Sequence, residues 1–566
     1  MRIKFYLIIF VFVSNCLLAT AQITAYQYEA QKNITVSRAA VVSAHTLASQ
    51  AGESILKKGG NAIDAAIATQ FALAVVYPGA GNIGGGGFMV AHLKNGKDFS
   101  LDYRETAPAA AFKDMYLDAA GNAVTAMSQW GYKACGVPGT VAGLFAALPY
   151  AKFKMPVLMA PAIQLAEKGF VITKEEAASL NSARKDFMDL NKEPIAFVKK
   201  ELWKAGDTLI QPQLAATLTR ISKLGASGFY EGATALMIQN GLQKNGGIIS
   251  LDALKNYKAK FRDPIRFNYR GYQIISMPLP SSGGIILQQV LKMIENKDVQ
   301  AMQFQSAASV QLLVEAERRA FADRAQYMGD ADFVQVPVKQ LLDDTYLQKR
   351  ISDYIPGKAG NSKETGAGII PEHEETTHIS ILDAEGNAVS VTTTLNGSYG
   401  SRVVIAGAGF IMNNEMDDFS IKEGVPNMYG AVGNAANAIA PGKRMLSSMT
   451  PTLVLKNKKP FIVVGTPGGT TIPTSVIQSL VNIIDFKMNA ADAVNKPKFH
   501  HQWLPDVIYI EKGFSPAVAD SLRNMGYTLQ TRSAIGRTEL IKINPTQKKK
   551  IEAVADHRGD DDARGY

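Results

Sequence analysis

Two threonines in the middle of the chain have the residue types and the spacing for nucleophilic chemistry. Thr376 precedes Thr377–Leu382, whose β-branched and roughly alternating residues predict a strand. A turn-like segment centred on Glu385 follows, and Ala388–Leu395 predicts a second strand. In the resulting hairpin Thr376 would face Thr394, and opposed residues lie about 4.5–5.5 Å apart at Cβ. The sequence therefore predicts that the Thr394 hydroxyl reaches Thr376.

The chemistry that this pair could perform depends on one backbone cleavage. If the Glu375–Thr376 bond is cut, Thr376 becomes an N-terminal residue whose hydroxyl is a nucleophile and whose α-amine is the nearest base. A free α-amine titrates at about 7.7–8.0, so it can accept a proton near neutral pH without large tuning. The chain would then be an amidase precursor that activates itself. From spacing alone, an ordinary threonine pair on a half-buried sheet is the simpler explanation, because threonine suits strands.

Further motifs along the chain favour the catalytic interpretation of Thr376 over an ordinary threonine pair. They are Gly59–Ala66, Asn82–Phe88, Asp102–Glu105, Gly136–Thr140, Pro280–Gly284, Ala322–Arg324, Phe410–Ser420, Lys443–Thr452 and Val463–Thr470. Together with the threonine hairpin they resemble the γ-glutamyltranspeptidase family of N-terminal-nucleophile hydrolases, over nearly the whole mature chain. The resemblance implies an α+β fold, the four-layer αββα sandwich of that superfamily, autoprocessed into two subunits.

The resemblance also implies the catalytic residues. Thr376 would attack the γ-carbonyl of a γ-glutamyl amide, and Thr394 would orient its hydroxyl and hold its amine. The oxyanion needs converging donors, and glycine lets backbone N–H groups approach closely. Gly468 and Gly469 match these donors; without the surrounding motif they would be a plain turn.

Recognition of the glutamyl group requires opposite charges at its α-carbon. Arg104 matches the family's carboxylate-binding arginine, with the bidentate fork that suits a carboxylate. Residues 425–442 resemble a lid loop over the bound group. Taken singly, most of these positions would be surface ion pairs or turn residues. The implied substrate-binding set is Arg104, Ser447 and Ser448 for the carboxylate, Asn396, Glu415 and Asp418 for the amine, and Tyr429 as the gating aromatic of the lid.

The beginning of the chain has the pattern of a secretory signal peptide. A basic start is followed by the apolar run Phe5–Val13 and by small residues before Gln22. The sequence thus predicts a leader over residues 1–21 and a secreted, periplasmic protein, with lipidation of Cys16 as an open alternative. Removal of the leader would leave Cys135 as a single cysteine, which we expect to be a buried small residue. No later segment is long and apolar enough to span a membrane.

Length and charge set the remaining expectations. At 566 residues the chain exceeds the usual single domain, and the predicted subunits are residues 22–375 and 376–566. The net charge of +10 is scattered without an aromatic-interleaved stripe, which argues against nucleic-acid binding. The implied partners are glutathione and other γ-glutamyl compounds, with amino-acid or dipeptide acceptors; no metal or organic cofactor is implied. An uncleaved, inactive γ-glutamyl-binding paralogue is the alternative.

Three segments could mislead, and a fourth is a predicted linker. Gly79–Gly84 matches the G-x-G-x-x-G fingerprint, but it follows a helical pattern rather than a strand, so we expect a glycine-rich turn. His373 and His378 are five residues apart rather than four, on a strand-like segment, and do not predict a zinc site. His500 and His501 are expected to pack or form structural hydrogen bonds. Residues 355–375 are linker-like and predicted to be mobile.

Overall fold

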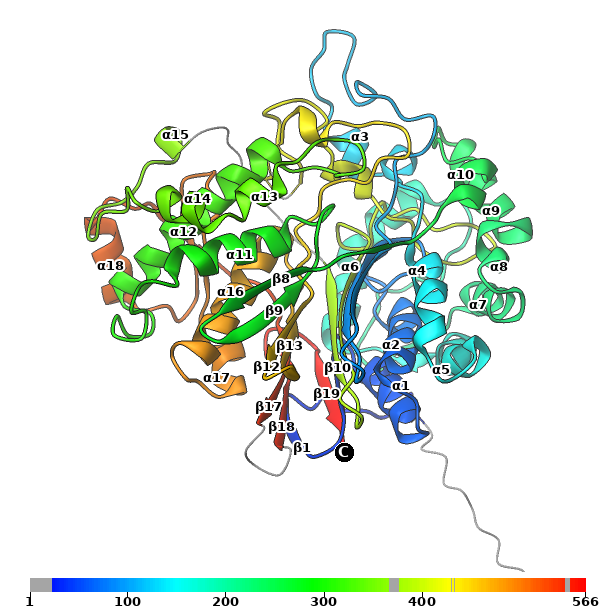
Figure 1. The fold of residues 1–566 in the computed structure, drawn as a ribbon. Helices are drawn as coiled ribbons and strands as arrows, with labels where there is room; N and C mark the ends of the chain where they lie inside the picture. The colour runs from blue at the N-terminus through cyan, green and yellow to red at the C-terminus, as the bar shows by residue number, and fades with distance from the viewer. Residues whose placement is uncertain (1–22, 366–375, 429, 432, 545–549) are drawn as a thin grey trace, which may run out of the picture.

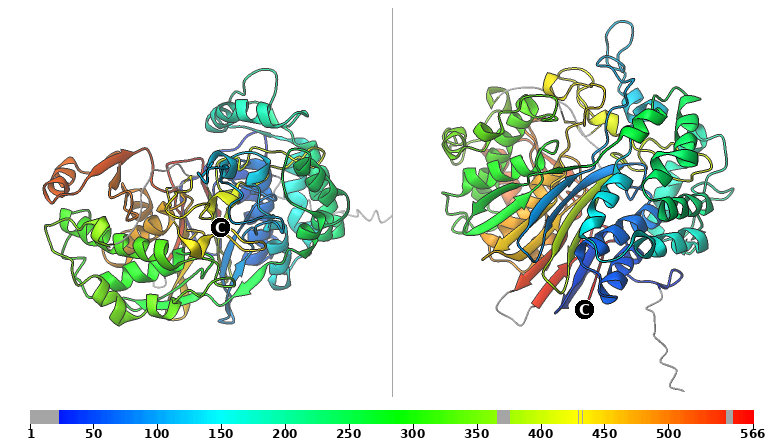
Figure 2. Two further views of the ribbon diagram at one scale, coloured as in Figure 1. Left: turned by 90° about the horizontal axis from the view of Figure 1, so that it is seen from above. Right: turned by 45° about the vertical axis from the view of Figure 1, so that its right-hand side comes forward.

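The protein forms four layers, with two β-sheets face to face and helices over the outer face of each sheet (Figure 1). The computed structural model describes residues 23–365, 376–428, 430–431, 433–544 and 550–566. The predicted leader, Glu375 and Tyr429 therefore lie outside the described residues. Seen from two further directions, the helical layers stay on opposite sides of the paired sheets (Figure 2). The expected αββα sandwich is confirmed.

One sheet, here called the hairpin sheet, contains both strands of the predicted hairpin, and the other is called the facing sheet. Neighbouring strands within each sheet are antiparallel. The hairpin sheet has the spatial order β19 (Asp562–Gly565), β2 (Ala40–Ser43), β10 (Thr377–Leu382), β11 (Ala388–Thr394), β3 (Gly86–His92), β4 (Asp98–Asp102) and β7 (Lys260–Arg262). The facing sheet has the order β1 (Asn33–Val36), β18 (Lys550–Val554), β17 (Glu539–Asn544), β13 (Lys459–Gly465), β12 (Thr452–Lys456), β9 (Tyr272–Ser276) and β8 (Ile265–Tyr269).

The two helical layers come from different parts of the chain. The layer on the hairpin sheet contains α1 (Thr46–Lys57), α2 (Ala62–Val76), α4 (Thr140–Ala147), α5 (Met155–Lys168), α6 (Lys174–Leu190), α7 (Pro212–Leu224), α8 (Ser227–Tyr230), α9 (Gly232–Gln243) and α10 (Leu251–Asn256). The layer on the facing sheet contains α11 (Gly283–Ile294), α12 (Ala307–Tyr327), α13 (Val338–Leu341), α14 (Asp344–Arg350), α15 (Ser362–Thr365), α16 (Thr471–Ile484), α17 (Ala490–Asn495) and α18 (Pro516–Asn524). The smaller elements are α3 (Ala126–Gln129), a sheet of β14 (Phe499–His500), β15 (Ile508–Glu511) and β16 (Leu529–Arg532), and a pair of β5 (Phe170–Val171) and β6 (Thr208–Leu209).

Strand alternation explains why the sheets are covered on both faces. On β2, Val41 packs under the helices whereas Ala40 and Val42 pack against the facing sheet. On β13, Val464 packs under α11 and α16 and its neighbour Val463 lies between the sheets. Because successive strand residues point to opposite faces, a strand that is apolar at every position can be buried only between two layers. The sequence therefore produces three apolar layers: two under helices and one between sheets.

The predicted hairpin forms with the predicted register. Leu382 pairs with Ala388 and Thr377 with Thr393, so the same register brings the two candidate threonines opposite each other at the open end. Asp383 closes the turn by accepting two backbone N–H groups through Oδ1, each at 2.9 Å. This local closure fixes the position of Thr376 at the end of a buried central strand.

The glycine-rich segment Gly79–Gly84 is a turn against packed backbone, as expected. It follows helix α2 and leads into strand β3, the reverse of the order in a dinucleotide fingerprint. A Cβ on the next residue, Gly85, would lie 2.1 Å from the Thr394 carbonyl oxygen, so only glycine fits. Asn82 donates from Nδ2 to that same oxygen at 2.8 Å. The segment therefore holds the end of β11 in place and does not have the structural context of a phosphate-binding loop.

The described part of the predicted linker is anchored. Gly357 donates its backbone N–H to Gln311 Oε1 at 2.9 Å, and Ser362 donates its N–H to Asp506 at 2.8 Å. Trp503 donates from its indole nitrogen to the Ser362 carbonyl at 3.0 Å. The charged and glycine-rich residues 355–365 thus find specific partners in the fold, and the mobility of the linker stays a prediction. Residues 366–375 lie outside the described residues. None of the described helices combines the length and apolar character needed to cross a bilayer.

Candidate active site

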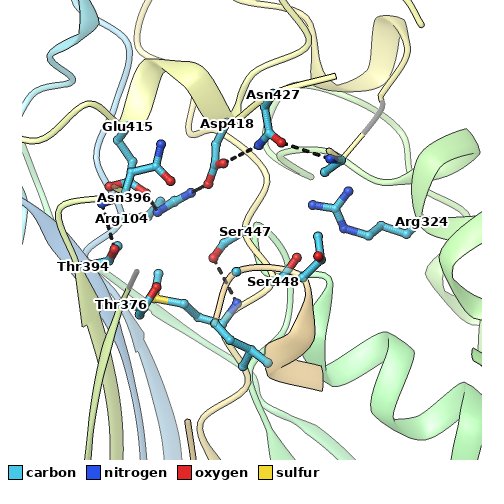
Figure 3. A pocket seen from close by; sticks show the side chains of 15 residues that line it. Arg104, Arg324, Thr376, Thr394, Asn396, Glu415, Asp418, Asn427, Ser447 and Ser448 are labelled. Carbon is cyan, nitrogen blue, oxygen red and sulfur yellow. Dashed lines mark hydrogen bonds and ion pairs between the residues drawn. The ribbon is translucent and has the colours of Figure 1, made fainter. Parts of the chain in front are cut away.

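A pocket opens at the end of the hairpin, and most of the predicted site residues line it (Figure 3). Its volume is about 330 Å³, including the part open to solvent. Thr376 and Thr394 contribute from the hairpin sheet, and several loops, the last turn of α12 and the start of α16 complete the wall. The lining residues are Arg104, Arg324, Thr376, Thr394, Asn396, Glu415, Asp418, Asn427, Ala431, Ser447, Ser448, Met449, Gly469, Thr470 and Ile472.

Thr394 is fixed by hydrogen bonds on both its side chain and its backbone. Its Oγ1 accepts the backbone N–H of Asn396 at 2.8 Å, and its carbonyl accepts from Asn82. Asn396 has a φ of 78°, a left-handed conformation that a non-glycine residue adopts at some cost in energy. Thr376 and Thr394 are 6% and 2% exposed, so the predicted nucleophile lies at the bottom of the pocket.

Arg104 lies at the centre of a buried ion-pair cluster. It follows β4, and its guanidinium contacts Glu415 through one terminal nitrogen and Asp418 through the other. A third carboxylate, that of Glu105, lies 3.8 Å from the Arg104 guanidinium. Glu415 and Asp418 follow Arg104 by 311 and 314 residues in the chain, yet the fold brings the three side chains together. Arg104, predicted to bind the substrate carboxylate, is thus adjacent to Glu415 and Asp418, which are predicted to bind the substrate amine.

Burial sets the protonation of this cluster. It raises the pKa of the Glu415 and Asp418 carboxyls, although the Arg104 charge opposes the shift in both. Burial likewise raises the pKa of Glu105 to about 7, against the same opposing charge. Burial disfavours the Arg104 cation, but the three carboxylates outweigh that effect and raise its pKa. The raised pKa values favour protonated carboxyl groups in this cluster, and an additional cation such as an ammonium group would favour their ionised form.

The serine pair is seated on a separate loop. Ser447 donates its backbone N–H to the Pro280 carbonyl at 2.8 Å, and its own carbonyl accepts the Ser282 N–H at 2.8 Å and the Ser282 hydroxyl at 2.7 Å. The Ser447 hydroxyl accepts the Met449 N–H at 3.1 Å. The Pro280–Gly284 motif therefore holds the serine loop at the pocket wall, and Ser448 lines the pocket beside it.

The two candidate oxyanion glycines come just before a buried helix. Gly468 and Gly469 have φ values of 133° and 49°, which favour glycine, and α16 begins at Thr471. Gly469 lines the pocket, whereas Gly468 is not among the lining residues and its carbonyl accepts the Thr471 N–H at 2.8 Å. Backbone N–H groups at a helix N-terminus attract negative charge. The arrangement therefore suits an oxyanion near Thr376.

Known proteins resemble this chain over most of its length. The family model for gamma-glutamyltranspeptidase matches residues 48–566. The chain belongs to this family. The glutathione hydrolase proenzyme of Escherichia coli (strain K12) is 45% identical over 533 residues, covering 93% of this chain and 91% of that protein. The corresponding proenzyme of Bacillus subtilis (strain 168) is 38% identical and covers 91% of this chain and 90% of that protein.

Solved structures give the same fold. The structure of a cephalosporin acylase from Bacillus halodurans aligns with a TM-score of 0.83 at 26% identity, covering 96% of this chain and 98% of that one. A structure of Helicobacter pylori gamma-glutamyltranspeptidase aligns with a TM-score of 0.56 at 45% identity, covering 60% of this chain and 95% of that one. The family membership and the αββα architecture predicted from the sequence are thus both confirmed.

The loop that resembles the family's lid approaches the site through two neighbouring residues. Asn427 donates from Nδ2 to Asp418 Oδ1 at 2.7 Å, and the Met428 backbone N–H donates to Asp417 Oδ2 at 2.7 Å. The Met428 sulfur lies 3.6 Å from Asn396 Nδ2. Tyr429, the predicted gating residue, lies outside the described residues, so its role stays a prediction.

Among the polar lining residues, Arg324 and Asn427 are two that were not assigned a role by the sequence. Arg324 is in the last turn of α12 and faces the pocket, and Asn427 lies in the lid loop. Arg324 belongs to the motif Ala322–Arg324, so its inclusion in the family pattern was visible, but nothing in the local sequence indicated that α12 ends at the pocket. Asn427 was within the lid segment, where only the aromatic residue had been singled out.

The remaining candidate residues are structural. His500 bonds to Thr474 Oγ1 at 2.9 Å and His501 to Asp506 at 3.2 Å, and burial lowers the pKa of both, that of His501 to about 4. Cys135 is buried as expected, and burial raises the pKa of its thiol to about 12. His373 lies outside the described residues. Within the described part of the chain, no three His, Cys, Asp or Glu side chains group as metal ligands would.

Proposed function

We propose that this protein is an autoprocessing γ-glutamyltransferase and glutathione hydrolase with Thr376 as its N-terminal nucleophile. The observation that carries this proposal is the pocket in which Thr376, Thr394 and the Arg104 cluster converge. A γ-glutamyl group presents a carboxylate and an ammonium at one carbon, and the cluster offers one cation and several carboxylates within contact of one another. The names of the relatives, glutathione hydrolase proenzymes, agree with it.

The precursor would activate itself by an N-to-O acyl shift. The Thr376 hydroxyl attacks the Glu375 carbonyl carbon, the C–N bond breaks, and the nitrogen takes the hydroxyl proton to become an amine. Water then hydrolyses the resulting ester, releasing the Glu375 carboxylate and restoring the Thr376 hydroxyl. The products would be a large subunit of residues 22–375 and a small subunit of residues 376–566, which remain associated because both contribute strands to each sheet.

Turnover would repeat this chemistry on the substrate. The Thr376 hydroxyl passes its proton to the α-amine as oxygen attacks the γ-carbonyl, and the N–H groups at Gly468 and Gly469 bind the oxyanion. The C–N bond then breaks, the departing amine takes the proton, and a γ-glutamyl ester remains on Thr376. Water or the amine of an amino acid or dipeptide attacks this ester, giving glutamate or a new γ-glutamyl amide and the free hydroxyl. Thr394 would hold the geometry of both steps.

Substrate recognition would divide between the two charged groups of the γ-glutamyl unit. Arg104, with Ser447 and Ser448, would bind the α-carboxylate. Asn396, Glu415 and Asp418 would bind the α-ammonium, and Tyr429 would close over both. Binding requires the substrate charges to replace part of the pairing within the Arg104 cluster. We expect the α-ammonium to favour the ionised form of carboxyl groups whose pKa burial has raised. We further propose export to the periplasm directed by the leader over residues 1–21.

The decisive experiment compares the wild type with Thr376→Ala. We expect the purified wild type to give two bands on SDS electrophoresis, with one new N-terminus reading Thr-Thr-His, and to release p-nitroaniline from γ-glutamyl-p-nitroanilide. Thr376→Ala should stay as one uncut chain and be inactive. A wild type that stays uncut and inactive, yet binds γ-glutamyl ligands, would support the alternative of a binding paralogue; a processed and active Thr376→Ala variant would refute the mechanism.

A further inference from the structure

The side chain of Met428 packs its thioether against two asparagine amides beside the pocket. Its sulfur accepts from Asn414 Nδ2 at 3.4 Å and from Asn396 Nδ2 at 3.6 Å. Its methyl carbon fills the space beside Gly397, where a Cβ on that glycine would lie 2.9 Å from it. The sulfur is therefore closely surrounded by the segment that follows Thr394 and by the start of the loop after Met412.

Asn396 connects this sulfur to the proposed chemistry. Its backbone N–H donates to Thr394 Oγ1, and its side chain lines the pocket, where the proposed function gives it a part in binding the α-ammonium. Its Nδ2 also donates to the Asn414 carbonyl at 3.0 Å. The orientation of the Asn396 amide thus depends on contacts that include the sulfur of Met428.

Exposure distinguishes Met428 from the methionines of neighbouring segments. Met428 is half-buried, so part of its side chain is in contact with solvent. The methionines that are instead at most 2% exposed are Met412, Met416, Met445 and Met449. A dissolved oxidant must touch the sulfur to react with it, so Met428 is the member of this group that such a molecule reaches without opening of the fold.

We propose that Met428 is a site of reversible oxidation by hydrogen peroxide, and that its sulfoxide weakens binding of the γ-glutamyl group. The effect on binding rests on the proposed γ-glutamyl transfer. A lone pair of the sulfur attacks one peroxide oxygen, the O–O bond breaks, and the departing hydroxide takes the remaining proton to become water. Sulfur loses two electrons to the peroxide and gains one bond to oxygen, giving methionine sulfoxide.

The added oxygen changes the contacts that hold the Asn396 amide. A thioether sulfur is a weak acceptor, whereas oxidation makes the side chain polar. The new oxygen either competes for the Asn396 and Asn414 amides or turns the Met428 side chain away from Gly397 toward solvent. Both outcomes reorient Asn396, so substrate binding should suffer more than the bond-breaking steps at Thr376. Met428 is here a positioning residue that acts through Asn396.

The test follows oxidation of two tryptic peptides by mass spectrometry while activity is measured. Residues 423–443 form a peptide whose single methionine is Met428, and residues 186–192 form one whose single methionine is Met188. Met188 is 53% exposed on α6 and does not line the pocket, so it reports general oxidation. When peroxide has converted Met428, the KM for γ-glutamyl-p-nitroanilide should rise by about 2- to 10-fold, the scale of one neutral hydrogen bond, while kcat changes less. Methionine sulfoxide reductases should restore the original KM.

Two variants assign the effect to one sulfur. Peroxide should leave the KM of Met428→Leu unchanged and should raise that of Met188→Leu as in the wild type. With the wild type alone, conversion of Met188 without Met428, or full conversion of Met428 with an unchanged KM, would overturn the inference while leaving the transferase intact. Absence of p-nitroaniline release by the untreated wild type would overturn the proposed function, and with it the claimed effect on γ-glutamyl binding.

Discussion

The hydroxyl of Thr394 gives a prediction that separates a local structural role from general stability. Thr394→Val keeps the shape of the side chain but removes the oxygen that accepts the Asn396 backbone N–H at 2.8 Å. That N–H is buried, because Asn396 is 2% exposed. A buried donor without a partner costs about 1–3 kcal/mol. Since about 1.4 kcal/mol is a factor of ten in an equilibrium constant, opening of this amide should become about 5- to 150-fold more frequent.

The assay is hydrogen exchange of the peptide that contains Asn396, read by mass spectrometry. Thr394→Val and a control variant, Thr377→Val, are both made in the Thr376→Ala background, so that differences in processing do not affect the comparison. Local exchange is the appropriate readout, because a chain of 566 residues is not expected to unfold in one cooperative step. The Asn396 amide should exchange about 5- to 150-fold faster in Thr394→Val than in the parent.

Thr377→Val is the matched control. Thr377 is also buried in the hairpin, one residue from Thr376, but its hydroxyl has no hydrogen-bond partner among the described residues. Replacing an unpaired buried hydroxyl by a methyl group removes a desolvation cost and should leave the Asn396 amide unchanged. Equal exchange in Thr394→Val and the parent, or equal acceleration in both valine variants, would refute the reasoning. In the active background Thr394→Val should also lower γ-glutamyl-p-nitroanilide hydrolysis by about 100-fold or more.

Three further predictions concern the core and the protonation of buried groups. Gly465→Ala would place its Cβ 2.2 Å from the His378 ring and should destabilise the protein by about 1–3 kcal/mol in thermal melts, whereas Gly241→Ala, which meets nothing nearer than 3.7 Å, should be neutral or stabilising. Burial raises the pKa of Asp417 from 3.8 to about 7, so its contribution to stability is complete below pH 3.8 and is lost as the pH rises to about 7; Asp417→Asn should therefore gain melting temperature relative to wild type more at pH 8 than at pH 4, and an equal difference at both would contradict this. Cys135, with a thiol pKa of about 12, should resist iodoacetamide at pH 8 in the native protein and react after denaturation, as peptide mapping would reveal.

Local sequence was sufficient for the hairpin and its register. Alternating β-branched residues and the turn around Glu385 specify which residues face each other, because both signals act over a few residues. The same holds for the start of α12 (Ala307–Tyr327), where the Ser306 side chain caps the helix by accepting the Ser309 N–H. The hydrogen bonds of Gly357 and Ser362 in the predicted linker could not be foreseen, because composition indicates how a segment behaves alone and says nothing of the partners that the fold supplies.

The convergence at the pocket was visible in the sequence only through resemblance to a family. Arg104 and Glu415 are 311 residues apart, and no periodicity connects them. Arg104 and Glu415 meet because β4 and β11 end at the same edge of one sheet, where the loops that carry these residues begin. Arg324 faces the same pocket from another wall because α12 ends there. The sequence by itself determined the hairpin that carries Thr376, the predicted nucleophile, since strand pattern and turn depend on neighbours along the chain. The charges around that nucleophile were decided only by the packing of distant loops, because electrostatic interaction depends on distance in space rather than along the chain.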